Sequence, residues 1–196
     1  MYQILKASFL YLPLIFAGTS HLILAKSSFL NLLKKPMDDG YILADGRRLL
    51  GDNKTWKGFI GMTVFTAFWF YVFGCFVKVT PWAAKLSLFP FVKFESGLLM
   101  LFYGMIWGLS YVVFELPNSF IKRRLDIGPG QKGKGLLGAF FVLIDQADSI
   151  IGCAIGMLIF YVPDWGTFWL IILMGIVIHY VMNIIFFLLK LKRRIG

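Results

Sequence analysis

Two aspartates, Asp145 and Asp148, interrupt the otherwise apolar run FFVLIDQADSIIGCAIGMLIF at residues 140–160. Such a run is typical of a membrane-spanning helix, in which a carboxylate costs about 3 kcal/mol or more. Residues three apart share a helix face, so the two carboxylates are expected to stand side by side. One of them would protonate unless a cation lies between them, and a hard divalent cation such as Mg²⁺ suits both. The pair therefore predicts a metal site inside the membrane.

The run that carries these acids is one of five that are long enough to cross a hydrocarbon core of about 30 Å. With 59% hydrophobic and 15% charged residues among 196, the chain is far from the composition of soluble globular proteins. We therefore predict an all-α integral membrane protein with a single transmembrane catalytic domain over 1–196. The predicted spans are 7–25, 58–77, 96–116, 136–160 and 167–189.

Lys and Arg residues are distributed unevenly over the segments between these spans. The segments 26–57, 117–135 and 190–196 hold sixteen of them, against four on the opposite side. The positive-inside rule predicts an amino terminus outside the cell, with two polar loops and the carboxyl terminus in the cytoplasm. Topology accounts for most of the net charge of +10, so nucleic acid is not a predicted partner. The expected location is the cell membrane, with the active site facing the cytoplasm.

Phosphate-binding groups gather at the cytoplasmic side of the predicted acids. Lys54 precedes the second span, the segment NSFIKRR follows the third, and Glu115 adds a third carboxylate. Carboxylates that hold a metal, together with Lys and Arg that neutralise phosphate, are what a nucleoside triphosphate requires. No P-loop motif G-x-x-x-x-G-K-[ST] is present, which excludes the P-loop nucleotide-binding folds.

Other functions of the two acids stay open at this point. A divalent-cation or proton-coupled transporter also uses carboxylates inside spans, although five spans without a visible repeat argue against it. An interhelical ion pair would give Asp145 a purely structural role, but no span shows a basic residue at a comparable depth.

Three sequence blocks together resemble the CDP-archaeol synthase family, which is related to the CDP-diacylglycerol synthases. They are KPMDDG with DGRRLLGDNKTWKG, then NSFIKRR, then DQADSIIG, and the resemblance covers about residues 31 to 185. Two positions depart from the family pattern, because Phe114-Glu115 replaces the usual Gly-Asp and Gly18 lies where an Asn is expected.

The resemblance implies a CTP:lipid-phosphate cytidylyltransferase that forms a CDP-activated membrane lipid and pyrophosphate for phospholipid biosynthesis. Its implied partners are CTP, a lipid phosphate and the bilayer. The acceptor stays open among an archaeal ether lipid phosphate, phosphatidic acid and other lipid phosphates. A CTP-dependent lipid kinase is the nearest alternative enzyme, and a homodimer stays open beside a monomer.

The resemblance and the charges together give the expected site. Asp145 and Asp148, with Glu115 as a third group, are expected to hold Mg²⁺, for which Mn²⁺ is an alternative. Lys122 and Lys54 complete the catalytic candidates. Expected contacts to CTP or the lipid phosphate are Arg123, Arg124, Ser119, Arg47, Arg48, Asp45, Asp38 and Thr55. Expected hydrogen-bonding groups between helices are Gln146, His179 and Asn183.

Overall fold

The computed structural model describes residues 1–131 and 133–192, and five of the helices in this part can cross a membrane by length and composition. The spans are Tyr2–Lys26, Trp56–Val79, Gly97–Arg124, Gly135–Ile159 and Trp165–Leu188. The prediction of an all-α protein with five spans is therefore confirmed. Lys132, Arg193 and Arg194, which contribute to the predicted charge asymmetry, lie outside the described residues.

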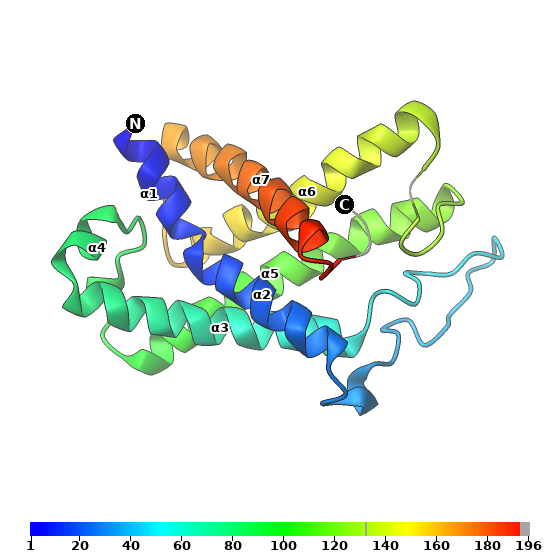
Figure 1. The fold of residues 1–196 in the computed structure, drawn as a ribbon, viewed down its shortest axis with the longest axis horizontal. Coiled ribbons are helices and arrows are strands. Elements are labelled where there is room, and N and C mark those ends of the chain that lie inside the picture. Colours follow the sequence, from blue (N-terminus) through cyan, green and yellow to red (C-terminus); the bar gives the residue numbers. More distant parts are fainter. Residues whose placement is uncertain (132, 193–196) are drawn as a thin grey trace.

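The first span is broken into α1 (Tyr2–Leu10) and α2 (Leu12–Lys26), which meet at Tyr11. The buried Tyr11 hydroxyl donates to the Ile171 carbonyl oxygen at 2.9 Å and ties this joint to α7 (Trp165–Leu188). Before the joint, α1 packs on α7, and after the joint, α2 packs on α3 (Trp56–Val79). The first span thus diverges from α7 along its length (Figure 1).

The helix α5 (Gly97–Arg124) packs on α3 through glycines that allow close backbone approach. A Cβ atom built on Gly104 would lie 2.8 Å from the Ala67 Cα, and one on Gly108 would lie 2.7 Å from the Thr66 Cβ. Helices in lipid associate through such close packing because the hydrophobic effect does not draw them together.

The helix α6 (Gly135–Gly156) uses the same device against the opposite side of α5. A Cβ on Gly152 would clash with the Ser110 carbonyl oxygen, and one on Gly156 would clash with the Ser110 hydroxyl. Two G-x-x-x-G pairs therefore hold α3, α5 and α6 together as a frame. On α6, Asp148 lies one turn and Asp145 two turns before Gly152.

Replacing Gly152 with valine is expected to push α6 away from α5 and to lower the free energy of unfolding by about 1–3 kcal/mol. Asp148 should move with the helix, because it lies one turn away on α6. Thermal unfolding in detergent micelles measures the effect. Ile151→Val, on the more exposed neighbouring position, is the control, and an unchanged melting temperature for Gly152→Val would contradict the packing argument.

An aromatic core fills the end of the bundle that contains the amino terminus. Fully buried Phe70 of α3 lies 4.8 Å from Phe91, 5.2 Å from Phe89 and 5.6 Å from Phe160, measured between ring centroids. Short elements near this core connect the spans: α4 (Pro81–Leu86), η2 (Phe91–Lys93) and η3 (Met157–Ile159).

The polar segments lie at the other end of the bundle. The connection from α2 to α3, which includes η1 (Asn31–Leu33), and the connection from α5 to α6 both extend on the side away from α4 (Figure 1). The end of α7 also points toward this side. The basic segments that the sequence groups together are therefore neighbours in the fold.

The predicted end of the third span at residue 116 is wrong, because α5 continues through Pro117 to Arg124. Proline removes one backbone hydrogen bond from a helix, and membrane helices tolerate this loss more readily than the sequence prediction allowed. As a result, Asn118, Ser119 and Lys122 stand on a rigid helix instead of a loop.

Candidate active site

Asp145 and Asp148 of α6 face Asn118 of α5, and both carboxylates accept a hydrogen bond from the same atom. Asn118 Nδ2 donates to Asp145 Oδ1 at 2.7 Å and to Asp148 Oδ2 at 2.6 Å. One turn further along α5, Lys122 Nζ donates to Asp145 Oδ2 at 2.6 Å. The expectation that no span brings a basic residue to this depth is therefore wrong, and the extension of α5 is the reason.

Glu115 continues the line of carboxylates toward the second span. The Ser149 hydroxyl donates to Glu115 Oε1 at 2.9 Å and lies 3.1 Å from Asp148 Oδ1. On its other side Glu115 forms an ion pair with Lys54, from the loop before α3. We call Asp145, Asp148 and Glu115 the acid row.

The donor set at the acid row fits a hard cation. No three His, Cys, Asp or Glu side chains in the described ranges surround one point as metal ligands would. An oxygen of each aspartate does face one point, because Asn118 Nδ2 bonds to both. Asn118 Oδ1 is buried and has no hydrogen-bond partner among residues 1–131 and 133–192. Carboxylate and amide oxygens are the hard ligands that Mg²⁺ prefers, and the Asn118 side chain would have to rotate to bring Oδ1 to the point that the two aspartates face.

Arg123 is a buried cation without a counter-ion in the part of the chain that the structure describes. It is 6% exposed, and neither Nε nor Nη1 has a hydrogen-bond partner. Gly51 leaves room for it, since a Cβ there would lie 2.9 Å from Nη1, and Gly51 has a φ of +106°. Burying a charge without a partner is costly, so this guanidinium is suited to bind an anion.

The other predicted substrate-binding residues with charged side chains form ion pairs. Two of these pairs hold the segment 27–55 against the end of α5 and the residues that follow it, and the pair of Arg48 with Asp38 lies within that segment. The pairs are Arg47 with Asp126 at 2.6 Å, Arg48 with Asp38 at 2.7 Å, and Arg124 with Asp45 at 2.8 Å. These contacts give each residue a role in loop structure, and their contact with CTP or the lipid phosphate stays a prediction.

Thr55 and Ser119 also have places in the frame. The Thr55 hydroxyl caps α3 by accepting from the Gly58 N–H at 3.2 Å. Ser119 is buried on α5 next to Asn118. A contact of either hydroxyl with phosphate stays a prediction as well.

Asp38 organises the first polar loop from a side chain that is wholly buried. Burial alone would raise its pKa, but the hydrogen bonds that it accepts from Arg48 and from the N–H groups of Gly51, Leu50 and Gly40 lower the pKa well below its ordinary value of 3.8. The ionised form is therefore the one that the folded loop stabilises.

Replacing Asp38 with asparagine is expected to lower the free energy of unfolding by about 1–3 kcal/mol at neutral pH, because Arg48 loses its buried partner. The folded pKa is depressed, so this contribution is fully present above pH 3.8 and is lost as the pH falls below that value. Thermal unfolding of both proteins from pH 7 to pH 3 should show the difference shrinking. A difference that grows toward low pH would contradict this account.

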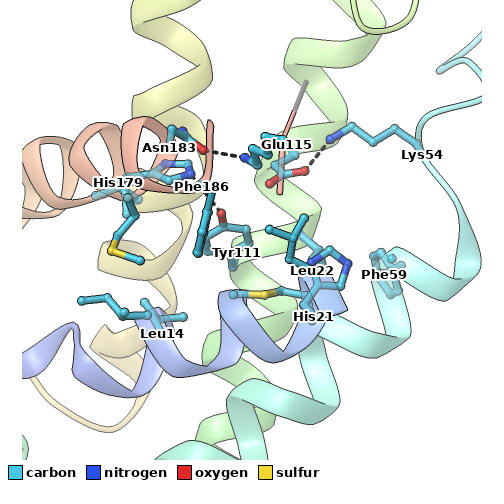
Figure 2. A pocket seen from close by; sticks show the side chains of 18 of the residues that line it. Leu14, His21, Leu22, Lys54, Phe59, Tyr111, Glu115, His179, Asn183 and Phe186 are labelled. Carbon is cyan, nitrogen blue, oxygen red and sulfur yellow. Dashed lines mark hydrogen bonds and ion pairs between the residues drawn. The ribbon is translucent and has the colours of Figure 1, made fainter. Parts of the chain in front are cut away.

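A cavity of about 290 Å³ lies between α2, α3, α5 and α7, and Figure 2 shows its lining. Its polar end contains Lys54, Glu115, His179, Asn183 and Lys192. The remainder is mostly apolar, with Leu14, Leu22, Phe59, Met62 and Phe186 among its side chains. The acid row reaches this cavity through Glu115 alone, so the cavity and the two aspartates lie on different sides of that residue.

Gln146, His179 and Asn183 form hydrogen bonds between α6 and α7, as predicted. Asn183 Nδ2 donates to Gln146 Oε1 at 2.7 Å, and His179 Nδ1 lies 3.2 Å from the Gln146 carbonyl oxygen. A carbonyl oxygen can only accept, so Nδ1 carries a hydrogen. His179 Nε2 faces the Tyr111 hydroxyl at 3.3 Å.

Two polar residues at these sites were missed by the sequence prediction. Asn118 lies inside NSFIKRR, a segment that was interpreted through its basic residues alone. Its position four residues before Lys122 could have indicated that the two side chains share a helix face. Lys192 was counted only as part of the basic tail. The position of Lys192 in the cavity depends on a turn after α7 that could not be predicted, because no glycine or asparagine marks it in the sequence.

Comparison with known proteins gives a consistent result. The family model described as CarS-like CDP-archaeol synthase matches residues 1–195. A CDP-archaeol synthase of Pyrococcus furiosus is 31% identical over 194 residues, which covers 98% of each chain. One of Archaeoglobus fulgidus is 32% identical, with 80% of this chain and 82% of the relative covered. One of Methanoculleus marisnigri is 34% identical, with 80% and 87% covered.

A solved structure is similar in fold. It is described as an intramembrane enzyme for archaeal membrane lipids biosynthesis. It superposes with a TM-score of 0.62 at 24% identity, covering 92% of this chain and 94% of that one. The arrangement of helices described above is therefore shared with an enzyme that works inside the membrane.

Proposed function

The chain belongs to the CDP-archaeol synthase family of CTP-dependent lipid cytidylyltransferases, and from this premise we propose that it joins the cytidylyl group of CTP to an archaeal ether lipid phosphate. The observation that carries the proposal is the placement of two unlike sites on either side of Glu115. On one side lie the two aspartates with Lys122, and the buried Arg123 lies on the same turn of α5 but faces Gly51 of the first polar loop. On the other side lies a cavity with a polar end and an apolar body.

The reaction is a nucleotidyl transfer. A phosphate oxygen of the lipid attacks the α-phosphorus of CTP, and the bond from that phosphorus to the bridging oxygen of the β-phosphate breaks. Pyrophosphate leaves with the electron pair of that bond, and a CDP-activated lipid remains. A phosphate monoester is already anionic near neutral pH, so positioning and charge neutralisation contribute more than proton removal.

The polar side of the site suits the triphosphate. Arg123 offers a guanidinium with free donors, and Lys122 stands one residue before it on α5. Mg²⁺, or Mn²⁺ in its place, would be held by Asp145 and Asp148 and would neutralise charge on the phosphate oxygens. When a triphosphate with its cation arrives, Lys122 can exchange its bond to Asp145 for a phosphate oxygen.

The cavity suits the acceptor, whose chains stay in the bilayer. Its polar end meets the acid row at the Lys54–Glu115 pair, so an anionic head group placed there faces the nucleotide site. Glu115 keeps the negative charge of the family aspartate with one more methylene. Its ion pair with Lys54 supports a role in positioning that lysine at the boundary between the two substrates.

The proposed orientation puts this end of the bundle in the cytoplasm of the cell. Two observations support it: the excess of Lys and Arg in the segments that gather here, and the need for CTP, which is a cytoplasmic metabolite. The amino terminus and α4 would then face the outside.

The test uses purified protein in detergent with CTP labelled in the α or the γ position. The acceptors are a diether glycerol phosphate, phosphatidic acid and the matching lipid alcohols. We expect the α label, and not the γ label, to enter the diether phosphate with release of pyrophosphate, and chelation of divalent cations to stop the reaction. Transfer of the γ label to an alcohol would show a lipid kinase instead. Faster reaction of phosphatidic acid would overturn the choice of acceptor.

A further inference from the structure

The chain reverses direction directly after α7 and returns one lysine to the cavity. Lys190 has a φ of +57°, and the N–H groups of Leu191 and Lys192 both donate to the Phe186 carbonyl oxygen, at 2.8 and 3.0 Å. The turn directs the Lys192 side chain back along α7, where Nζ donates to Asn183 Oδ1. Lys192 therefore lines the cavity although it follows the last span.

This turn is also fastened to the first span. Lys26 at the end of α2 donates from Nζ to the Lys190 carbonyl oxygen at 3.2 Å. The bond joins the ends of the two helices between which the cavity lies. The position of Lys192 over the polar end of the cavity is thus fixed from two sides.

The charges at the polar end of the cavity are not balanced. Lys54 and Lys192 contribute two ammonium groups, and Glu115, which pairs with Lys54, is the one carboxylate among the lining residues. The hydrogen-bond partner of Lys192 in the described part of the chain is a neutral amide oxygen. Burial lowers the pKa of Lys192, and the nearby charges of Glu115 and Asp145 offset this effect only in part. An anion at this position would supply the rest.

The lining below the two lysines identifies the kind of anion. Leu14, Phe59, Met62, Met182 and Phe186 line the cavity beneath its polar end. A phosphate on a hydrocarbon body fits this arrangement, since its charged end meets the lysines and its body meets apolar side chains. The triphosphate of CTP fits this lining less well, because it is charged along its whole length and would lie against apolar side chains.

We propose that Lys192, together with Lys54, binds the phosphate group of the lipid acceptor. The inference rests on the proposed function and adds a substrate-binding residue to it. Asn183 positions the ammonium group, because its Nδ2 is committed to Gln146 Oε1 and its Oδ1 must then face Lys192. Gln146 lies between the two aspartates on α6, so the acceptor site is held in a fixed relation to the acid row.

The test compares Lys192→Gln and Lys192→Arg with wild type, and uses Lys190→Gln as the matched control. Lys190 lies in the same turn and carries the same charge, but its side chain is exposed. Steady-state kinetics with the diether glycerol phosphate and CTP give a KM for each substrate. We expect Lys192→Gln to raise the KM for the lipid phosphate about tenfold and that for CTP less than twofold. Lys192→Arg should recover most of the loss, and Lys190→Gln should match wild type.

A second measurement separates this inference from the proposed function. Equilibrium binding of the radiolabelled diether glycerol phosphate, with the corresponding diether alcohol as reference, requires no turnover. Wild type should prefer the phosphate, and Lys192→Gln should lose that preference. If wild type transfers no cytidylyl group but shows the preference, the function fails and the binding site stands. Equal KM values for Lys192→Gln and wild type, or a rise confined to CTP, would overturn the role of Lys192.

Discussion

Replacing Arg123 with methionine is expected to reduce cytidylyl transfer about 10²–10³-fold while leaving the protein at least as stable as wild type. A buried guanidinium without a partner costs free energy in the folded state, and an apolar side chain of similar length removes that cost. If Arg123 binds the triphosphate, the lower activity of the variant should come with a lower affinity for CTP and not with a loss of stability. Initial rates, CTP binding and thermal unfolding in detergent measure the three quantities.

Lys57 provides the contrasting control for Arg123. It is 2% exposed, but its Nζ donates to the Ser27 carbonyl oxygen at 2.8 Å, so it has a structural partner. Lys57→Met should lower stability by about 1–3 kcal/mol and keep the turnover of the folded fraction. An Arg123→Met protein that unfolds more readily than wild type and retains CTP affinity would mean that Arg123 is structural.

Replacing Asp148 with asparagine is expected to lower transfer by about 10³-fold or more. The substitution keeps the shape of the side chain and removes the charge that faces Asp145 across Asn118. It should also remove the effect of Mg²⁺ on CTP binding, because one of the two proposed ligands is lost. CTP affinity measured with Mg²⁺ and with a chelator separates this effect from a loss of turnover alone.

Asp39→Asn is the matched control for Asp148. Asp39 is exposed in the first polar loop, and its φ of +43° is one that asparagine adopts readily. This variant should behave as wild type in every measurement. More than a tenth of wild-type activity in Asp148→Asn, with unchanged dependence on Mg²⁺, would remove Asp148 from the catalytic site.

Composition and hydropathy were sufficient to predict the spans, because length and apolar content alone decide whether a helix can cross a bilayer. The predicted ranges 58–77 and 136–160 agree closely with the observed Trp56–Val79 and Gly135–Ile159. The failure at Pro117 has a physical cause. Proline ends most helices in water, whereas a membrane helix can continue through it.

The pairing of helices was harder to predict, although its signal is visible in the sequence. The G-x-x-x-G pairs at 104–108 and 152–156 bring α5 against α3 and α6, and that packing puts Asn118 opposite Asp145. The spacing of the two aspartates predicted that they share a helix face, and their shared donor confirms it. The identity of that donor could not be predicted, because it depends on the register of two helices.

The contact between Tyr11 and Ile171 joins residues 160 positions apart, and this distance has a consequence for synthesis. A ribosome delivers α1 and α2 to the membrane first and α7 last, so the neighbours α2, α3, α5 and α6 can pair while the chain is still being made. The wall of the cavity that α7 forms is added only after α1 to α6 have been made. Chains that stop before α7 would keep the contacts of α5 with α6 that bring the two aspartates together, and would lack the α7 wall of the cavity.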